Sequence, residues 1–295
     1  MRPNYLVILA EPDPIAQRVA ERWGTPPSTG EIVDGVPIRS LSNSVGLLRR
    51  STPHIHDDHV ERRLPARFAG GASTLVFASV HRSESEIPCF TVHPLGNLGP
   101  TAEVGGEPFR LVPAAPRLMT DALRRLAEAG TAIGWSATFE ATHHGPSLAV
   151  PAFFAEIGAG KGATAPDAAV RVLADVLADL DEDGRDRVVV GLGGGHYVPH
   201  FTEVALARRW AFGHLLSRHA LADATEESLG AAIEATPGAE GVMFARAADA
   251  EDPRLARLGR RLREGESPRR RPAGPEDRAR PGIGPGPSRP RSSSG

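Results

Sequence analysis

Apolar runs of strand length alternate along this chain with segments whose apolar residues recur at helical spacing. The run YLVILA at residues 5–10 predicts a buried strand, and Asp13-Pro14 predicts the start of a helix that ends near Trp23. Aspartate is a favoured helix N-cap, proline suits the first helical position, and a glycine such as Gly24 commonly follows the last turn. The opening segment therefore predicts a strand followed by a helix.

The same pattern continues further along the chain. Asp34-Gly35 between two β-prone runs predicts a tight hairpin. Apolar and β-branched runs predict strands at residues 74–79, 89–93, 187–192, 210–217 and 241–247, and an extended segment at 136–144. Helical spacing predicts helices at residues 116–130, 165–180 and 225–235, the last opened by a capping box. Strands that alternate with helices indicate an α/β fold with helices on the faces of a sheet.

The composition changes abruptly near Glu264. Residues 264–295 consist mainly of proline, glycine, serine and arginine, and such a segment cannot bury enough apolar surface to offset its ordering entropy. We therefore expect residues 1–263 to form the folded domain, with a C-terminal subdomain over roughly residues 200–263. Residues 264–295 are expected to be a disordered tail.

Charge is unevenly distributed over the 295 residues, whose formal net charge is −2. Residues 267–295 carry seven arginines against two acidic residues, a balance of +5 that leaves −7 on residues 1–266. An acidic body does not bind nucleic acid through its general field. RNA binding would therefore need a local groove lined by arginines such as Arg82, Arg208 and Arg209, which fit solvated helix faces equally well.

Other features narrow the class of protein. Cys89 is the single cysteine, which excludes an intramolecular disulfide framework and a cysteine-rich zinc cluster. Its place in an apolar strand favours a buried, inert thiol. No apolar run approaches the ~18 residues of a membrane span, and the first residues lack the apolar region and cleavage site of a secretory signal. We expect a cytoplasmic protein without a membrane segment.

Several of the eleven histidines follow predicted strands. These are His81, His93, the pair His143 and His144, and His196. Ligands of α/β sheets bind outside the carboxyl ends of the strands. One such histidine alone would more often be a packed core residue, but four strand ends that each deliver histidine favour a shared site on one rim of the sheet.

Carboxylates accompany these histidines. Glu84 and Glu86 follow His81, Glu140 precedes His143, and Glu156 lies in another apolar run. Imidazoles and carboxylates are the usual ligands of a catalytic zinc, which activates a water molecule. A His–Glu pair can also act as a general base without metal. The residue types leave both mechanisms open, since the chain lacks an HExxH motif and also lacks the GxSxG motif of a serine nucleophile.

The glycine cluster in GLGGGHYVP, residues 191–199, follows a predicted strand. A dinucleotide-binding fingerprint needs glycine where this chain has His196, and no Gly-Lys-Ser/Thr of a Walker loop follows. A tight turn alone explains one or two glycines. Three in a row before His196 and Tyr197 favour a backbone turn in a hydrolytic site, with N–H groups that approach a carbonyl or phosphate.

Five blocks of the sequence together resemble the archaeal and plant type of D-aminoacyl-tRNA deacylase. They are residues 79–97, 139–146 with EATHHGP, 151–158, 191–199 with GGGHY, and 211–216. The resemblance spans residues 5–220 and extends more loosely to about residue 245. It implies hydrolysis of the ester between a D-amino acid and the tRNA 3′ end, in quality control of mischarged tRNA. It also implies a zinc cofactor and a three-layer α/β/α sandwich, like that of phosphorylases and peptidyl-tRNA hydrolases, with an extra C-terminal α/β part.

With this resemblance, roles can be assigned to individual residues. The expected catalytic residues are His144, His196, Glu140, Gly194 and Gly195, the two glycines through their backbone N–H groups. The expected zinc ligands are His81, Glu84, His93, His143, His144, His196 and Glu156. The expected substrate contacts are Arg82, Asn97, Tyr197 and Gly193. The family's Ser-Arg-x-Asp element is here residues 10–13, which keep the acid and lack the arginine.

Two other functions fit the same residues. A zinc-dependent amidohydrolase or peptidase acting on a small substrate would use the same site without tRNA. A non-catalytic tRNA-binding protein would bind tRNA in a salt-sensitive way and release no amino acid. The leading hypothesis predicts aminoacyl-tRNA as the substrate, no obligate protein partner, no membrane contact and a monomer.

Overall fold

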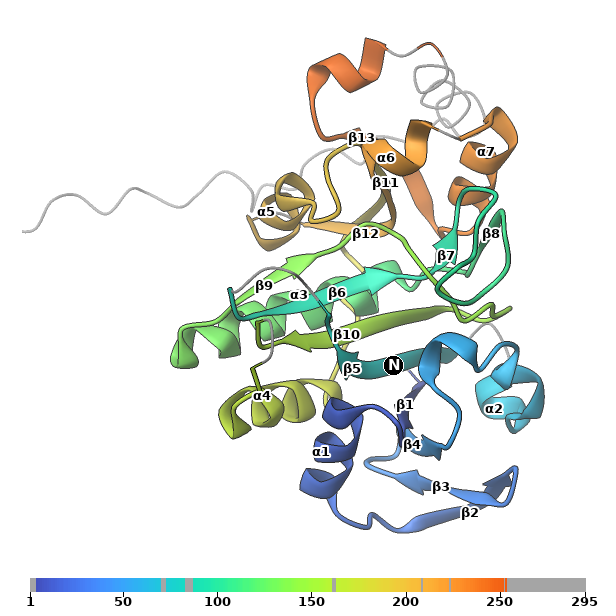
Figure 1. The fold of residues 1–295 in the computed structure, drawn as a ribbon, viewed down its shortest axis with the longest axis vertical. Helices are drawn as coiled ribbons and strands as arrows, with labels where there is room; N and C mark the ends of the chain where they lie inside the picture. Colours follow the sequence, from blue (N-terminus) through green and yellow to red (C-terminus); the bar gives the residue numbers. More distant parts are fainter. Residues whose placement is uncertain are drawn as a thin grey trace, which may run out of the picture.

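The computed structural model describes residues 4–69, 73–82, 87–160, 163–207, 209–222 and 224–251, and Pro253. These residues form a large mixed sheet, a smaller parallel sheet above it and a two-stranded ribbon beside both (Figure 1). The large sheet contains β2 (Ser28–Val33), β3 (Val36–Ser40), β4 (Val45–Arg50), β1 (Asn4–Ala10), β5 (Ser73–Val80), β10 (Ala152–Gly158), β6 (Cys89–Pro94) and β9 (Ser136–Phe139), in this spatial order.

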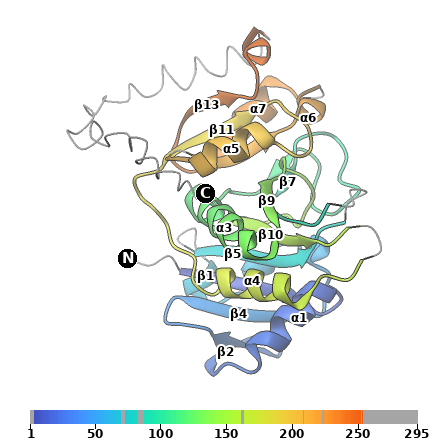
Figure 2. The same ribbon diagram turned by 90° about the vertical axis from the view of Figure 1, so that its left-hand side faces the viewer.

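Helices of full length cover one face of the large sheet. They are α1 (Pro14–Trp23), α4 (Asp167–Leu177) and α3 (Pro116–Gly130), which lie side by side (Figure 2). The opposite face carries shorter elements: α2 (Ala66–Ala69) and the 3₁₀ turns η1 (His54–His56) and η2 (Val60–Arg63). The predicted α/β fold with helices flanking a sheet is therefore confirmed, with short elements and loops on the second face.

Successive side chains of a strand point to opposite faces of the large sheet, and a hydrophobic core lies on each face. Tyr5, Val7 and Leu9 of β1 pack under the long helices, whereas Leu6 and Ile8 pack under the short elements. This follows from the two-residue period of a strand, which sends successive side chains to opposite faces. Because both faces are covered, β1 reads in the sequence as one continuous apolar run.

The C-terminal part is built on the parallel sheet of β12 (Trp210–Leu216), β11 (Arg187–Leu192) and β13 (Ala239–Phe244). It also contains α5 (Pro199–Ala207), α6 (Arg218–Ala222), α7 (Glu226–Glu234) and η4 (Ala247–Glu251). The predicted C-terminal subdomain starts near residue 200, whereas β11, which belongs to this sheet, ends at Leu192. The subdomain boundary remains a prediction. Residues 264–295, the predicted tail, lie outside the described residues.

Local sequence signals account for several element boundaries. The Asp13 carboxylate accepts hydrogen bonds from the N–H groups of Ile15 and Ala16, both at 2.8 Å, and so caps α1 as predicted. Asp34 and Gly35 have φ values of +48° and +81°, the left-handed pair of a tight hairpin between β2 and β3. The predicted capping box of α7 is also present. No helix among the described residues is long and apolar enough to span a bilayer.

Candidate active site

Two rows of side chains on the large sheet form the floor of the candidate site. Glu156 of β10 lies between Ser79 of β5 and Thr91 of β6, and two residues away Phe154 lies between Phe77 and His93. Residues two apart in a strand point to the same face. The sheet therefore presents a polar row beside an aromatic row, on the face that carries the short elements.

The strand directions differ from those expected from the sequence. β10 is parallel to β5, but β6 is antiparallel to β10, and β9 is parallel to β6. The carboxyl ends of β5 and β6 therefore point in opposite directions. The prediction that the histidines meet where the strands end, on one rim of the sheet, is wrong. His81 and His93 meet instead across the face, because the side chain of Glu156 lies between them.

Glu156 is the buried anion of this floor. It accepts hydrogen bonds from the hydroxyl groups of Ser79 and Thr91. Its Oε2 atom lies 3.4 Å from His81 Nδ1 and 3.8 Å from His93 Nε2. Burial opposes its ionisation, but the two nearby imidazoles and the Ser79 hydroxyl outweigh burial and hold the pKa of Glu156 well below its usual range.

Glu140 is a second buried carboxylate, one residue beyond the end of β9. Its backbone N–H donates to the carbonyl of Val92 at 3.0 Å, and its side chain is completely buried. Its Oε1 atom lies 3.0 Å from His81 Nδ1, and its Oε2 atom lies 3.1 Å from His196 Nε2 and 3.7 Å from His143 Nε2. Burial raises the pKa of Glu140, but these imidazoles and His93 outweigh burial and lower it.

The loop after Glu140 orients two neutral imidazoles. The Nδ1 atom of His143 donates to the carbonyl of Ala141 at 2.8 Å, and that of His144 donates to the carbonyl of Gly145 at 2.7 Å. Both Nε2 atoms are then lone-pair donors. Burial and the neighbouring His93 lower the pKa of His144 to about 4 and that of His143 well below its usual range. Both rings are therefore neutral near pH 7, the form that binds metal.

These seven residues form one connected unit, which we call the histidine–carboxylate cluster: His81, His93, Glu140, His143, His144, Glu156 and His196. Within it, three overlapping sets place their ligand atoms within 4.8 Å of one another: His93, His143 and His144; Glu140, His143 and His196; His81, Glu140 and Glu156. The cluster can therefore hold a metal ion, and its nitrogen and oxygen donors are of the types that zinc accepts.

Unsatisfied polar atoms distinguish the cluster from an ordinary buried network. The Nε2 atom of His93 and both carboxylate oxygens of Glu140 are buried without a hydrogen bond of good geometry to any described residue. A buried polar atom without a partner costs about 1–3 kcal/mol. Three such atoms side by side indicate that the cluster is built for a further group, such as an ion or a reacting water.

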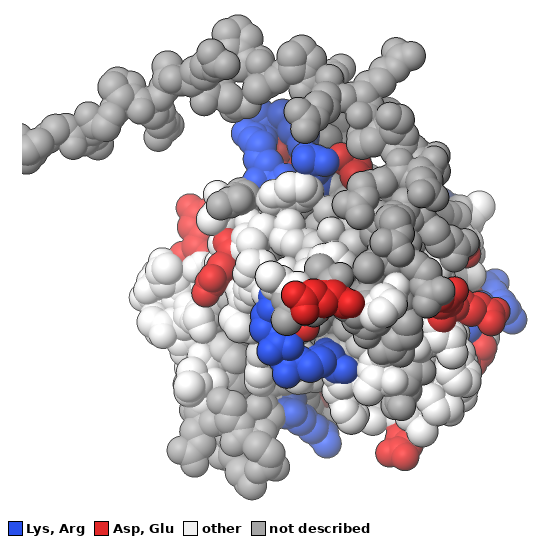
Figure 3. Space-filling model, turned by 90° about the horizontal axis from the view of Figure 1, so that it is seen from above, with Lys and Arg blue, Asp and Glu red and all other residues white. Residues whose placement is uncertain are grey.

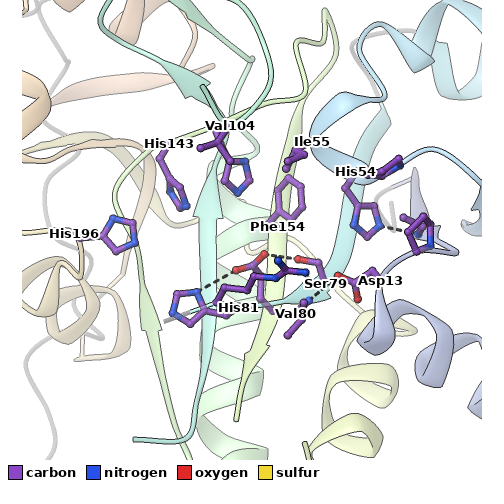
Figure 4. A pocket seen from close by; sticks show the side chains of 16 residues that line it. Asp13, His54, Ile55, Ser79, Val80, His81, Val104, His143, Phe154 and His196 are labelled. Carbon is purple, nitrogen blue, oxygen red and sulfur yellow. Dashed lines mark hydrogen bonds and ion pairs between the residues drawn. The ribbon is translucent and has the colours of Figure 1, made fainter. Parts of the chain in front are cut away.

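A cavity of about 570 Å³ opens over the cluster (Figure 4). This volume suits a small organic group, since ligand pockets span ~300–1,000 Å³. His81, His143 and His196 lie on one side of it, and His54 and Asp13 on the other. The remaining wall is largely apolar and includes Pro12, Pro53, Ile55, Val80, Val104 and Phe154.

Comparison with known proteins identifies the family. The model of the D-aminoacyl-tRNA deacylase family matches residues 69–259. The D-aminoacyl-tRNA deacylase of Pyrococcus abyssi is 35% identical over 210 residues, which cover 70% of this chain and 76% of that protein. The chain belongs to the D-aminoacyl-tRNA deacylase family. The resemblance seen in the sequence is thereby confirmed.

Further relatives agree with this assignment. The D-aminoacyl-tRNA deacylase of Thermoplasma acidophilum is 34% identical over 193 residues, which cover 65% of this chain and 74% of that protein. A crystal structure of a conserved protein of unknown function is 27% identical with a TM-score of 0.77, covering 89% of this chain and 92% of the other. The relative thus supports the family, and the solved structure shares the fold over most of the chain.

The structure brings most of the deacylase's predicted site residues together, but not all. Arg82 lines the cavity, and the Tyr197 hydroxyl lies 2.7 Å from His81 Nε2. The Asn97 side chain instead donates to the carbonyls of Gly105 at 3.0 Å and Glu107 at 3.3 Å, and so holds a neighbouring loop. Glu84 lies outside the described residues.

The glycine turn lies between the cluster and the second sheet. Gly193 and Gly194 have φ values of +100° and +86°, and a Cβ on Gly193 would lie 2.4 Å from the Asp249 carboxylate. The Gly193 N–H donates to the carbonyl of Leu216 at 2.8 Å, so it is already used within the fold. The predicted oxyanion role of Gly194 and Gly195 remains a prediction.

His54 is a cavity residue that the sequence did not reveal. It is buried, and its Nε2 atom accepts a hydrogen bond from the Ala10 N–H at 2.8 Å. Burial lowers the pKa of His54, although nearby acidic groups oppose this shift. Its surroundings in the sequence, HIHDDH, contain three histidines within six residues, and nothing in their spacing marks the first as part of the cavity.

Proposed function

We propose that this deacylase hydrolyses the ester bond between a D-amino acid and the 3′ adenosine of tRNA, releasing free D-amino acid and tRNA. This reaction would remove mischarged tRNA before it enters translation. The observation that carries the proposal is the histidine–carboxylate cluster with its unsatisfied atoms, at the floor of a cavity in a chain of this family. An aminoacyl ester is reactive, so one oriented water and one stabilised oxyanion suffice.

We further propose that the bound metal is zinc. The three overlapping ligand sets supply imidazoles and ionised carboxylates, and the unpartnered Nε2 atom of His93 supports this fit. When bound, zinc would polarise the ester carbonyl and lower the pKa of a water molecule. The predicted ligands among the described residues are His81, His93, His143, His144, Glu156 and His196. Of these, His196 is assigned to proton transfer, and the others would hold the ion.

Proton transfer is assigned to the pair of Glu140 and His196. The His196 side chain is half exposed at the cavity, whereas Glu140 is completely buried 3.1 Å below it. In this geometry Glu140 orients the ring and stabilises its charged form, while the outer nitrogen of His196 accepts a proton from water and returns it to the ribose oxygen. General base catalysis of this kind contributes about 10²–10⁴-fold.

Stabilisation of the oxyanion is assigned, as predicted, to the backbone N–H groups of Gly194 and Gly195. They directly precede His196 and would each contribute to an effect of ~3–4 kcal/mol. His144, which also lines the cavity, would complete the catalytic set. Arg82 and Tyr197 would contact the substrate at the cavity, with Asn97 and Gly193 acting through the loops that they shape.

The surface charge of the described residues favours a few local contacts with tRNA, and it does not form a broad basic face. Arginines of the second sheet pair with acids: Arg187 with Glu240, Arg209 with Asp183, and Arg246 with Asp249. On the face shown in Figure 3, described basic and acidic side chains lie interspersed. This arrangement gives no support to a protein that only binds tRNA, because such binding depends on many unpaired cations.

One assay tests the proposal. Purified protein is incubated with D- and L-aminoacyl-tRNA, with and without a chelator, and free amino acid and bound metal are measured. We expect rapid D-specific release that chelation abolishes. Tight tRNA binding without release would favour the non-catalytic alternative. Turnover of small amides, indifferent to tRNA and to salt, would favour the amidohydrolase.

The same proposal includes a cytoplasmic monomer that needs no obligate protein partner. Its support is the substrate, since aminoacyl-tRNA is used in the cytoplasm, and the fact that one chain supplies the complete cluster. Light scattering of the active protein at the concentration of the assay would test the oligomeric state. Activity confined to a larger species would contradict it.

A further inference from the structure

The loop of residues 99–109 combines two exposed apolar side chains with an unusual backbone. We call it the lip loop, because its Val104 lines the cavity. Val104 and Phe109 are 52% and 54% exposed, and they are two of the five large hydrophobic side chains that are exposed among the described residues. Phe109 is the single aromatic side chain in that set. An exposed apolar side chain that borders a cavity is a candidate ligand contact, because ligand sites are lined mainly by apolar and aromatic groups.

The backbone of Phe109 adds a second observation. Its φ is +54°, the left-handed region, which is a clear outlier for a bulky residue. The fold imposes this conformation, because the Phe109 N–H donates to the Gly99 carbonyl at 2.9 Å and the next residues pair in the ribbon of β7 (Gly96–Asn97) and β8 (Arg110–Leu111). Strain of this kind persists where the surrounding structure fixes it, commonly at ligand sites.

The lip loop is also held rigidly against the cavity wall. The Asn97 amide donates to the carbonyls of Gly105 and Glu107, and Gly145 donates to the Val104 carbonyl at 3.2 Å. Gly105 lies so close to Ile55 that a Cβ would come within 1.9 Å of the Ile55 carbonyl oxygen. The exposed side chains therefore sit on a preorganised surface, which reduces the ordering cost of binding.

A groove of about 430 Å³ lies along Phe109, beyond the cavity. Pro108, Phe109, Leu111 and Leu148 line it together with Ala231 of α7. Arg110 supplies a half-exposed cation at this groove, and its guanidinium lies 3.7 Å from the carboxylate of Glu107, which also lines it. Phe109 follows Val104 by five positions, and five residues span at most about 18 Å. The groove is therefore within reach of the nucleotides that precede a group bound in the cavity.

We propose that the lip loop binds the unpaired nucleotides of the tRNA 3′ end that precede the esterified adenosine, with a base stacked on Phe109. The inference rests on the proposed function. It adds a contact with the preceding nucleotides, without which the ester could still be hydrolysed. Bases offer flat faces to aromatic side chains whatever their identity. Arg110, at the same groove, faces the phosphates that connect them. Two exposed apolar side chains are too few for a protein interface, which buries about 800 Å² on each partner.

The test compares Phe109→Ala with wild type on two substrates. One is D-aminoacyl-tRNA, and the other is D-aminoacyl-adenosine, which lacks the preceding nucleotides. Stacking on an aromatic side chain is worth about 5- to 150-fold per base. We expect the variant to raise KM for D-aminoacyl-tRNA by a factor in this range with little change in kcat, and to leave kcat/KM for D-aminoacyl-adenosine unchanged. Alanine keeps the Cβ, so the backbone strain at this position is not altered.

Matched variants control for folding and for exposure. Phe109→Trp restores a stacking surface and should return KM toward the wild-type value. Ile32→Ala removes a side chain that is 65% exposed on β2. This variant should keep the wild-type KM and kcat/KM for both substrates. Equal losses on both substrates, or no loss on D-aminoacyl-tRNA, would overturn the proposal.

A binding measurement separates this inference from the proposed function. An uncharged CCA trinucleotide with a fluorescent cytosine analogue at its second position reports stacking without catalysis. We expect quenching with wild type and Phe109→Trp, and at least fivefold weaker binding with Phe109→Ala. Quenching by a wild-type protein that lacks deacylase activity would support the lip loop and refute the proposed function. A change in self-association on Phe109→Ala, without a change in quenching, would refute the lip loop.

Discussion

His93 and His214 are both completely buried, yet their surroundings differ. His214 of β12 has partners at both nitrogens: its Nε2 donates to the Val112 carbonyl at 3.0 Å, and its Nδ1 lies 3.1 Å from the Thr142 hydroxyl. His93 of β6 donates through Nδ1 to the Pro94 carbonyl, but its Nε2 has no hydrogen-bond partner among the described residues.

The ionisation of the two rings differs in the same way. Burial lowers the pKa of His214 to about 4, so it is neutral near pH 7. Burial also opposes the charge on His93, but Glu156 and Glu140 outweigh it and raise the pKa of His93. The comparison teaches that burial by itself does not mark a functional histidine. What separates His93 from His214 is an unpartnered nitrogen within a set of possible metal ligands.

The largest expected effect separates catalysis from structure. Glu140→Gln removes the carboxylate that orients His196, and we expect kcat for D-aminoacyl-tRNA to fall by about 10²–10⁴-fold. The free energy of unfolding should fall as well, because the change breaks the buried pairs with His81 and His196, so kcat is compared on folded protein. His214→Gln serves as the matched variant and should keep kcat within a few-fold of wild type.

Single-turnover kinetics with urea unfolding of both variants checks this pair. His196→Ala and His144→Ala should lose most activity in the same assay, with folding intact. If Glu140→Gln keeps turnover, the assignment of the site is wrong. If His214→Gln loses as much activity as Glu140→Gln, the distinction between the two buried regions fails.

Metal binding gives the next largest effect. His93→Gln removes one nitrogen of the set formed with His143 and His144, and we expect zinc affinity to fall by at least the 10–100-fold typical of lost supporting contacts. His214→Gln should bind zinc as wild type does. Competition titration against a chelating dye, with elemental analysis of dialysed protein, measures both. Added zinc should also raise the Tm of wild type more than that of His93→Gln, since a ligand of the folded state stabilises it.

From the sequence, it was easier to predict which residues form the site than how they are arranged. The spacing of His81, His93, His143 and His196 after apolar runs predicted a shared site, and the structure brings them together. Their assembly by strand ends at one rim was not correct, because strand direction is a property of pairing between distant segments. One signal was present: only residues 81–88 connect β5 to β6, and a parallel crossover needs a dozen or more.

Local elements were predictable where one short segment fixes the outcome. The Asp13 cap of α1 and the Asp34-Gly35 hairpin depend on neighbours in sequence, and both are present. The contributions of Ser79, Thr91 and His54 depend instead on register and on loop placement across the sheet. Serine, threonine and single histidines occur throughout the chain, so no pattern distinguishes these three in advance.

A pH dependence of stability follows from the neutral state of His214. Its pKa is about 4 in the folded chain, against about 6.5 in an unfolded one. Between these values the unfolded state binds more protons, so the free energy of unfolding falls as the pH falls through this window. The loss is at most about 1.4 kcal/mol per pH unit, or roughly 3 kcal/mol by pH 4.

Urea unfolding of wild type and His214→Gln at several pH values isolates this contribution, because the other histidines are common to both. We expect the variant's free energy of unfolding to decline less steeply between pH 6.5 and 4. Parallel curves for the two proteins would show that His214 takes up its proton in the folded state, contrary to its buried and fully bonded environment.

The smallest expected effect lies at the joint between the two regions. Thr142 follows Glu140 by two residues, and its N–H donates to the Leu215 carbonyl of β12 at 2.7 Å. Its hydroxyl accepts from the Leu215 N–H at 3.0 Å and donates to His214 Nδ1. Thr142→Val keeps the shape but leaves both partners unbonded, and we expect a loss of about 1–2 kcal/mol in the free energy of unfolding.

Thr142→Ser is the matched control, since it keeps the hydroxyl and should cost about 0.8 kcal/mol for the lost methyl group. Because Thr142 ties the loop that carries His143 and His144 to the second sheet, Thr142→Val should also lower kcat by a few-fold, and Thr142→Ser should lower it less. Equal stability of the two variants would mean that the hydroxyl does not join the structural histidine to the catalytic loop. The second sheet would then support the catalytic loop through the backbone bond from Thr142 to Leu215 and through packing.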